Sequence, residues 1–224
     1  MKTIYIVRHA KAESSETDTP DFERSLIERG INDAHDVAAR LSDREDKPTL
    51  LISSPAARAI QTARIFAEHL AYPKKKIRTR KSMYDQTGDI LSEIIHAIDN
   101  EFDTVLLTGH DPSFSGLANT LAKKFSGNLP TCGLLGLEFK VKTWEEIAPG
   151  TGKKIVFDYP GAAKKPGKKK VLRKQLETEI EKLITHILIK NGVDESKKAN
   201  KIIAKVSRKV AKELAESLTA KSKK

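Results

Sequence analysis

Short continuous runs of apolar residues alternate, along the first 160 residues, with longer segments in which apolar positions recur every three to four residues. An apolar run without polar alternation is typical of a strand buried on both faces, and the longer spacing is typical of a helix with one buried face. The pattern predicts strands over residues 4–7, 50–52, 77–80, 104–107, 134–141 and 155–158. It predicts helices over residues 31–41, 56–70, 90–98 and 114–123. Such an alternation favours an α/β domain, a three-layer α/β/α arrangement with a mainly parallel central sheet.

The last part of the chain follows a different pattern. Residues 162–170 are rich in lysine and are interrupted by Pro and Gly, which predicts a basic linker. Residues 171–224 then carry two apolar stripes at helical spacing, separated by Asn191-Gly192. We therefore expect one domain over residues 1–161 and, beyond the linker, a lysine-rich helical hairpin with a frayed end at residues 220–224.

Charge divides the chain at the same place. The chain has 224 residues and a formal net charge of +11, which at first suggests a nucleic-acid partner. Residues 1–163 hold 22 Lys and Arg against 23 Asp and Glu, whereas residues 164–224 hold 19 against 7. The basicity therefore belongs to the hairpin region and says nothing about the chemistry of the first domain.

Three roles for the basic hairpin stay open. It can pack against the domain or form a dimer contact, it can bind an anionic partner through residues 164–224, or it can lie on a membrane surface. Nucleic acid is one such anionic partner, but residues 164–224 contain no recognition motif and no aromatic residue for base stacking. Binding to nucleic acid would therefore involve the phosphate backbone only.

Several protein classes are disfavoured by what the sequence contains. No apolar run approaches the ~20 residues of a transmembrane helix, and the first residues do not read as a secretory signal. Cys132 is the single cysteine, so neither an intramolecular disulfide nor a cysteine zinc cluster can form. We expect a cytoplasmic protein that uses no metal and no cofactor.

Side chains suited to phosphate chemistry follow three of the predicted strands. Arg8-His9 follows the first strand, residues 53–58 follow the second, and Gly109-His110 follows a later one. Ligands of open α/β sheets bind beyond the carboxyl ends of the strands, so these side chains are expected to share one crevice. Arginine offers a planar cation to phosphoryl oxygens, and a neutral histidine can attack phosphorus. A second histidine, if protonated, would donate to the oxygens.

Four ordered segments resemble the histidine phosphatase superfamily, which includes the phosphoglycerate mutases. They are Val7-Arg8-His9-Ala10-Lys11-Ala12, Asp21-Phe22-Glu23-Arg24-Ser25-Leu26 with Glu28-Arg29-Gly30, Ser53-Ser54-Pro55-Ala56-Ala57-Arg58-Ala59-Ile60-Gln61-Thr62-Ala63, and Val105-Leu106-Leu107-Thr108-Gly109-His110-Asp111-Pro112. The form Arg-His-Ala-Lys, in place of Arg-His-Gly, is similar to the small phosphohistidine phosphatases of the SixA type. The resemblance covers about residues 1–160 and implies a phosphoglycerate mutase-like fold. It also implies a metal-independent phosphatase that acts through a phosphohistidine intermediate, on phosphohistidine in proteins.

The resemblance implies a role for each matched residue. His9 is the implied nucleophile, and Arg8 and Arg58 bind the phosphoryl oxygens. His110 completes the phosphate pocket, and Arg24 reaches it from a loop.

The proton donor is less clearly implied. In the mutase branch an acidic residue follows the third strand, and Asp85 in Met83-Tyr84-Asp85 is the nearest match, with Asp89 and Glu93 as alternatives. The SixA-type proteins do not need a strong acid, because a protonated imidazole is a better leaving group than an alkoxide.

Two positions depart from the SixA-type pattern. Ser25 stands where Pro is usual, and Asp111 stands where Asn is usual. A carboxylate beside His110 is expected to raise the proton affinity of that histidine. Because it would repel a phosphate, we expect Asp111 to point away from the pocket or to cap the following helix.

Two alternative functions remain. One is a small-molecule phosphomonoesterase of the same fold, so that the substrate is either a phosphorylated protein or a small phosphorylated compound. The other is a catalytically silent phosphatase fold that serves as an anion-binding or scaffold module through its basic tail.

Overall fold

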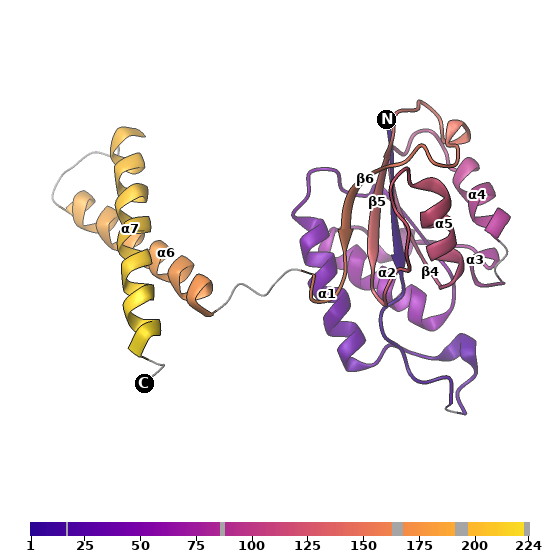
Figure 1. Ribbon diagram of the computed structural model, residues 1–224, viewed down its shortest axis with the longest axis horizontal. Helices are drawn as coiled ribbons and strands as arrows, with labels where there is room; N and C mark the ends of the chain where they lie inside the picture. Colours follow the sequence, from indigo (N-terminus) through magenta and orange to yellow (C-terminus); the bar gives the residue numbers. More distant parts are fainter. Residues whose placement is uncertain (17, 86–87, 163–167, 191–196, 222–224) are drawn as a thin grey trace. The chain divides into compact units, whose positions relative to one another are not determined.

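The computed structural model describes residues 1–221 except residues 17, 86–87, 163–167 and 191–196. It divides into two compact units, Met1–Ala162 and Ala163–Lys224. The first unit is a six-stranded sheet flanked by helices, and the second consists of two helices (Figure 1). Each unit is described by itself below.

The sheet has the strand order β3-β2-β4-β1-β5-β6. Its strands are β1 (Lys2–Arg8), β2 (Leu50–Ser53), β3 (Arg78–Thr79), β4 (Thr104–Gly109), β5 (Leu134–Phe139) and β6 (Lys153–Asp158). The first four are parallel to one another, whereas β5 runs antiparallel to β1 and β6 antiparallel to β5. The carboxyl ends of β1, β2 and β4 therefore meet at one edge, with β1 and β2 on either side of β4.

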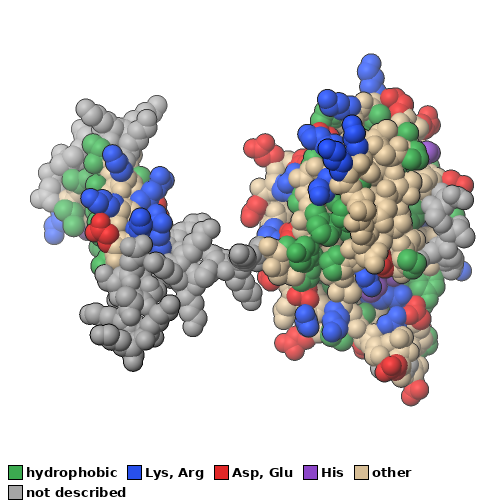
Figure 2. Space-filling view, in the orientation of Figure 1, with side chains coloured by type: hydrophobic (Ala, Val, Ile, Leu, Met, Phe, Trp, Pro, Cys, Tyr) green, Lys and Arg blue, Asp and Glu red, His purple; other side chains and the backbone are tan. Residues whose placement is uncertain are grey.

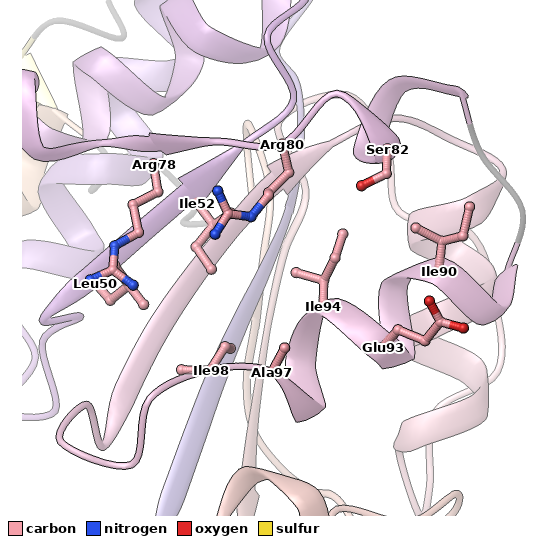
Figure 3. A pocket seen from close by; sticks show the side chains of 10 residues that line it. All are labelled: Leu50, Ile52, Arg78, Arg80, Ser82, Ile90, Glu93, Ile94, Ala97 and Ile98. Atoms are coloured by element: carbon pink, nitrogen blue, oxygen red, sulfur yellow. The ribbon is translucent and has the colours of Figure 1, made fainter.

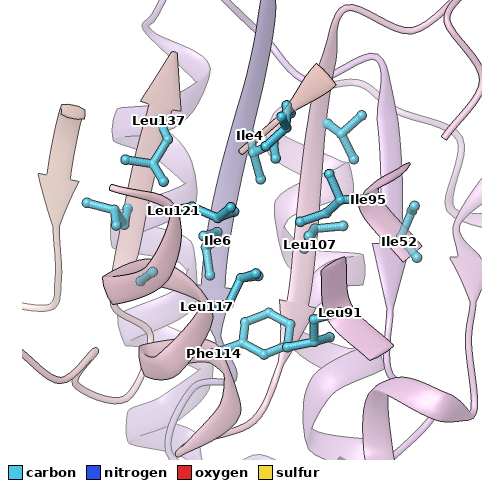
Figure 4. Close-up of a cluster of buried hydrophobic side chains, with 14 of the residues drawn as sticks. Ile4, Ile6, Ile52, Leu91, Ile95, Leu107, Phe114, Leu117, Leu121 and Leu137 are labelled. Carbon is cyan, nitrogen blue, oxygen red and sulfur yellow. The ribbon is translucent and has the colours of Figure 1, made fainter. Parts of the chain in front are cut away.

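Helices cover both faces of the sheet, because side chains of the inner strands alternate between two apolar clusters. Ile4 and Ile6 of β1 belong to a cluster with α4 (Gly88–His96) and α5 (Ser113–Leu121), which Figure 4 shows. Tyr5 and Val7 belong to the other cluster, with α1 (Glu28–Ser42) and α2 (Ala57–His69). A continuous apolar run thus serves two cores at once.

The expected fold class is confirmed: the unit has the three-layer, phosphoglycerate mutase-like architecture, and two helices follow it. The differences are local. A short helix, α3 (Ser82–Asp85), was not predicted, and β3 is limited to two exposed residues at the sheet edge. Most other elements begin or end within a few residues of their predicted bounds.

The second unit contains α6 (Lys168–Lys190) and α7 (Lys197–Lys221). Helix α6 begins inside the stretch predicted as a linker, so residues 168–170 are helical, which corrects the bounds 162–170. Residues 163–167 lie outside the described residues. Helix α7 continues to Lys221, inside the stretch predicted to fray, and residues 222–224 are not described.

The two helices pack through a narrow face of α7. Ile203, Ser207 and Ala211, spaced four residues apart, are buried. The neighbouring apolar positions of α7 are exposed: Ile202, Val206, Val210 and Leu214. From the sequence pattern we expected all the apolar positions to share one buried side. In the structure α6 instead packs along the row of residues that includes the small Ser207 and Ala211. Within the described residues, no helix is long and apolar enough to cross a membrane.

Candidate active site

The carboxyl ends of β1, β2 and β4 are tied together by backbone hydrogen bonds. The amide of His9 donates to the carbonyl of Gly109 at 2.9 Å, and the amide of Ser54 donates to the carbonyl of Thr108 at 2.9 Å. The carbonyl of His9 accepts the amide of buried Cys132 at 3.0 Å. The backbone on which the candidate nucleophile sits is therefore held on both sides.

A glycine before His110 is required by close packing. A Cβ atom at Gly109 would lie 2.2 Å from the Phe114 ring, which belongs to the core under α5. A larger residue would displace either this ring or the end of β4. The ring of His110 then lies 5.2 Å from the ring of His9, measured between centroids.

His9 has one defined tautomer. Its Nδ1 lies 2.8 Å from the carbonyl oxygen of Ala10, which can only accept, so Nδ1 carries the proton. Nε2 is left with a lone pair and accepts the Nε–H of Arg58 at 3.3 Å. Burial, with the charge of Arg58 adding to it, lowers the pKa of His9 to about 4. At neutral pH this imidazole is uncharged and nucleophilic at Nε2.

This lowered pKa predicts an unusual acid limit for catalysis. The reactive form of His9 is the neutral one, which dominates above its pKa and is lost as the pH falls through about 4. An unperturbed histidine would lose its nucleophile near a pH of about 6.5. We therefore expect kcat/KM for p-nitrophenyl phosphate, corrected for substrate ionisation, to fall only as the pH approaches 4. A loss of activity centred near the unperturbed value would contradict this assignment.

His110 is also neutral. Its side chain is buried, and burial, with neighbouring His9 and Arg58, lowers its pKa to about 3. This corrects the idea of a protonated second histidine. Nε2 of His110 lies 2.8 Å from Oγ of Ser54. Nδ1 is buried and has no hydrogen-bond partner among the described residues.

Asp111 faces the helix and Arg8 rather than His110. One carboxylate oxygen accepts the amide of Ser115 at 3.2 Å, in the first turn of α5, and also the hydroxyl of Ser115. The other lies 3.5 Å from Nη1 of Arg8. The prediction that Asp111 would raise the proton affinity of His110 is therefore corrected, whereas its expected bond to the start of the helix is present.

Arg8, Arg58 and Arg24 are held in different ways. Arg8 donates from Nη1 to the carbonyl of Leu129 at 2.8 Å. Arg58 is buried, and its Nη2 lies 2.9 Å from Oδ2 of Asp21. Arg24 donates to Oδ1 of the same aspartate, from Nε at 3.0 Å and also from Nη2. Arg58 and Arg24 are thus brought together by one carboxylate.

Asp21 is a residue that sequence reasoning missed. It begins a single 3₁₀ turn, Asp21–Glu23, and its carboxylate also accepts the hydroxyl of Tyr84 at 2.9 Å. The hydrogen bond from Arg24, supported by Tyr84 and Arg58, holds the pKa of Asp21 well below its usual range. Because of this low pKa the carboxylate of Asp21 is ionised at neutral pH. It lies against the two guanidinium groups that would bind phosphate.

Two further partners were also missed. Ser54 contacts His110, and Tyr84 lies against it edge-on, with ring centroids 5.6 Å apart. Both positions were visible in the sequence, Ser54 directly after a strand and Tyr84 beside the proposed acid. Only the fold shows that they face the second histidine.

The predicted acid is placed only by its backbone. Asp85 is the last residue of α3, directly after Tyr84, and its side chain lies outside the described residues, as does that of Asp89. Glu93 is exposed on α4 and lines a separate cavity. Among the described residues, no group of three or more His, Cys, Asp or Glu could hold a metal ion.

Comparisons with known proteins confirm the resemblance in the sequence. Residues 4–103 match the histidine phosphatase superfamily (branch 1). The crystal structure of the putative phosphohistidine phosphatase SixA from Agrobacterium tumefaciens is 27% identical, with a TM-score of 0.61, over 71% of this chain and 98% of that protein. A protein histidine phosphatase SixA complexed with tungstate is 20% identical, with a TM-score of 0.60, over 70% and 97%.

A curated relative gives no information about activity, because its name states none. An uncharacterised protein of Mycobacterium tuberculosis is 26% identical over 166 residues, which are 69% of this chain and 99% of the relative. The family match and the structural likeness together support phosphatase activity.

Proposed function

We propose, with the confirmed resemblance to the histidine phosphatase superfamily as the premise, that the first unit hydrolyses phosphohistidine in proteins through a phosphorylated His9. The observation that carries the proposal is the state of His9, which is neutral, bonded through Nδ1–H to a carbonyl, and has its Nε2 lone pair beside a guanidinium. The small-molecule phosphomonoesterase is the alternative enzyme.

The reaction is a double displacement at phosphorus. Nε2 of His9 attacks the phosphoryl group, so that an N–P bond forms while the bond from phosphorus to the leaving group breaks. Arg58, Arg8, Arg24 and the buried His110 donate to the phosphoryl oxygens, where negative charge is spread. Water then attacks the phosphorus, the bond to His9 breaks, and inorganic phosphate leaves. His9 returns to its neutral form.

His110 can donate while it is neutral. Oγ of Ser54 accepts the amide of Ala56 at 3.3 Å, and the hydroxyl proton of Ser54 is then available for Nε2 of His110. This arrangement leaves the proton of His110 on Nδ1, the buried atom with no partner among the described residues. We assign this N–H to a phosphoryl oxygen. Asp85 remains the proposed acid for leaving groups that need one, and a phosphohistidine leaving group, which departs as imidazole, makes the smallest demand on it.

The substrate class is tested by comparing two phosphoryl donors at equal concentration. A synthetic phosphohistidine peptide and a small alkyl phosphomonoester, glycerol 2-phosphate, would be assayed for phosphate release by the full chain. We expect a higher kcat/KM for the peptide, because its leaving group needs less protonation. A higher kcat/KM for the monoester would favour the small-molecule alternative instead. If neither substrate is hydrolysed, the chain is the silent phosphatase fold.

The position of Asp21 leads to a second prediction, which concerns the affinity of the site for phosphate. Its carboxylate accepts hydrogen bonds from N–H groups of Arg58 and Arg24 that phosphate would also need. Phosphate binding therefore requires that these bonds to Asp21 break. Asp21→Asn is expected to lower the inhibition constant of inorganic phosphate by about tenfold, because the competing charge is removed. Glu23→Gln, in the same exposed turn, is the control and should leave it unchanged. A higher inhibition constant in Asp21→Asn would show that Asp21 assists phosphate binding.

The structure of the second unit supports a separate proposal, that this unit binds an anionic partner. A groove of about 430 Å³ is lined by Arg173 of α6 and by a cationic face of α7. The cations of that face are Lys205, Arg208, Lys209 and Lys212. Arg208 is paired with Glu177 at 2.9 Å, and no carboxylate is among the described residues that line the groove. Lys and Arg side chains are visible on the described part of this unit in Figure 2. The exposed apolar positions of α7 support the competing role, a packing or dimer contact.

The anion proposal predicts a salt-dependent affinity for a nucleic-acid backbone. Short duplex DNA of random sequence is the probe. The triple variant Lys205→Gln, Lys209→Gln, Lys212→Gln should flatten the slope of log Kd against log salt by about two to three, because each lost phosphate contact removes ~0.9. Lys182→Gln with Lys190→Gln, on α6 outside the groove, is the control. Equal slopes in the wild type and the triple variant would show that the groove does not bind the DNA backbone.

A further inference from the structure

A cavity of about 420 Å³ opens between the edge of the sheet and α4 (Figure 3). Its walls are apolar: Leu50 and Ile52 of β2 form one side, and Ile90 and Ile94 of α4 form part of the other. Ile90 and Ile94 are only half-buried, so apolar surface is left open to a partner.

Two arginines line this cavity, and neither has an acidic partner among the described residues. The guanidinium of Arg78 lies over the ring of Phe102 at 5.1 Å, and Arg80 donates to the carbonyl of Thr79 at 3.4 Å. Neither forms an ion pair with a described residue. Glu93 also lines the cavity but is not within ion-pair distance of them. Two positive charges are therefore available to an anionic ligand.

The arginines belong to a strongly basic run. Residues 74–81 read Lys-Lys-Lys-Ile-Arg-Thr-Arg-Lys, and every cation among them is exposed. Only Lys74 is paired with a carboxylate of the described chain, that of Glu68 at 2.8 Å. We call the cavity and residues 74–81 the docking groove. Its charge complements an acidic ligand, and its walls complement apolar side chains.

The edge of the sheet passes through the docking groove. Among the strands that the structure describes, β3 pairs with β2 alone, through Ile52 opposite Arg78 and Ser53 opposite Thr79. Its outer edge is thus open to an extended segment, which can add to an exposed strand through backbone hydrogen bonds. A peptide fits these features better than a small molecule does, because it supplies an extended backbone together with charged and apolar side chains.

The docking groove is connected to the phosphate site by short lengths of chain. The amide of Arg80 donates to the carbonyl of Ser53, and the next residue, Ser54, holds His110. Four residues after Arg80, the hydroxyl of Tyr84 donates to Asp21. A segment bound in the docking groove would therefore lie beside the catalytic edge of the sheet.

We propose that the docking groove binds an acidic segment, with interspersed apolar side chains, of the phosphorylated protein substrate. Anionic side chains of the segment pair with Arg78 and Arg80, and apolar ones contact Ile90 and Ile94. The proposal rests on the proposed function, since it assumes that the substrate is a protein.

Binding is tested without catalysis. The probe is a fluorescein-labelled, unphosphorylated peptide of alternating Glu and Val, and its anisotropy is measured with the full chain. Arg78→Glu with Arg80→Glu should weaken binding by about tenfold or more, because two attractive contacts become repulsive. Lys123→Glu with Lys124→Glu is the matched charge reversal, on exposed residues beyond the far end of α5, and should leave the Kd unchanged. Equal affinity of the wild type and the arginine variant, or no binding by the wild type, would overturn the proposal.

Catalysis provides the second readout. Two phosphohistidine peptides, one with Glu-rich and one with Lys-rich flanks, are compared by kcat/KM. The wild type should prefer the acidic flanks, through KM, and the arginine variant should lose or invert that preference. Hydrolysis of p-nitrophenyl phosphate should be unchanged in the variant, which also reports that it is folded. Activity on the monoester but on neither peptide would refute the substrate class alone, whereas the binding experiment still decides the docking groove.

Discussion

Replacing His9 by alanine is expected to lower kcat/KM by at least about 10³-fold, for a phosphohistidine peptide and for p-nitrophenyl phosphate alike. No other described histidine can take its place. Nε2 of His110 is occupied by Ser54, and the backbone of His9, not that of His110, is held between the strands. The measurement is the steady-state release of phosphate.

The control is a histidine of the same unit that takes no part in the site. His35 of α1 contacts His69 at 2.9 Å and is not one of the proposed site residues, so His35→Ala should keep wild-type activity. Circular dichroism and thermal unfolding would show that the His9 variant is folded. More than a tenth of the wild-type activity in a folded His9→Ala protein would exclude His9 as the nucleophile.

Replacing Arg58 by alanine is expected to have the next largest effect, a loss of about 10²- to 10³-fold in kcat/KM. Arg58 is buried, donates to Nε2 of His9 and pairs with Asp21, so in the proposed mechanism one guanidinium would contact both the nucleophile and the phosphoryl group. Arg58→Lys should restore only part of the activity, because an ammonium group cannot reproduce the planar fork.

The matched control for Arg58 is an exposed cation on the same helix. Arg64→Ala, on α2, should leave kcat/KM unchanged. If Arg58→Ala were folded and as active as Arg64→Ala, the phosphate would have to be bound by other groups, and the geometry of the site would need another explanation.

The fold was predictable because its inner strands are short apolar runs with side chains that fill two cores. The same runs located most of the candidate site, since Arg8 ends a strand and His9 and His110 each stand directly after one. A sheet with parallel central strands brings such positions to one edge, whatever lies between them in the chain.

The electrostatics of the site could not be predicted from order along the chain. Asp21 lies 37 residues from Arg58 and 63 from Tyr84, and only the folded loop places one carboxylate against both. The same holds for His110, whose neighbours in sequence suggested a raised pKa. In the structure Asp111 is bonded to Ser115, and burial of the imidazole has the larger effect.

The hairpin was predictable as two helices but not in its packing. An apolar stripe shows that a helix has a buried face, and it does not show which partner covers that face. In α7 the small residues Ser207 and Ala211 meet α6, while Val206 and Val210 stay exposed.

The central claim, a covalent phosphohistidine at His9, is tested most directly by trapping. The full chain is mixed with a ³²P-labelled phosphohistidine peptide, quenched in alkali, and the label is located by peptide mapping. We predict an acid-labile, alkali-stable label on the peptide that contains His9, and its absence in His9→Ala. Full hydrolysis with no label on the wild-type protein, or a label that persists in His9→Ala, would contradict the account.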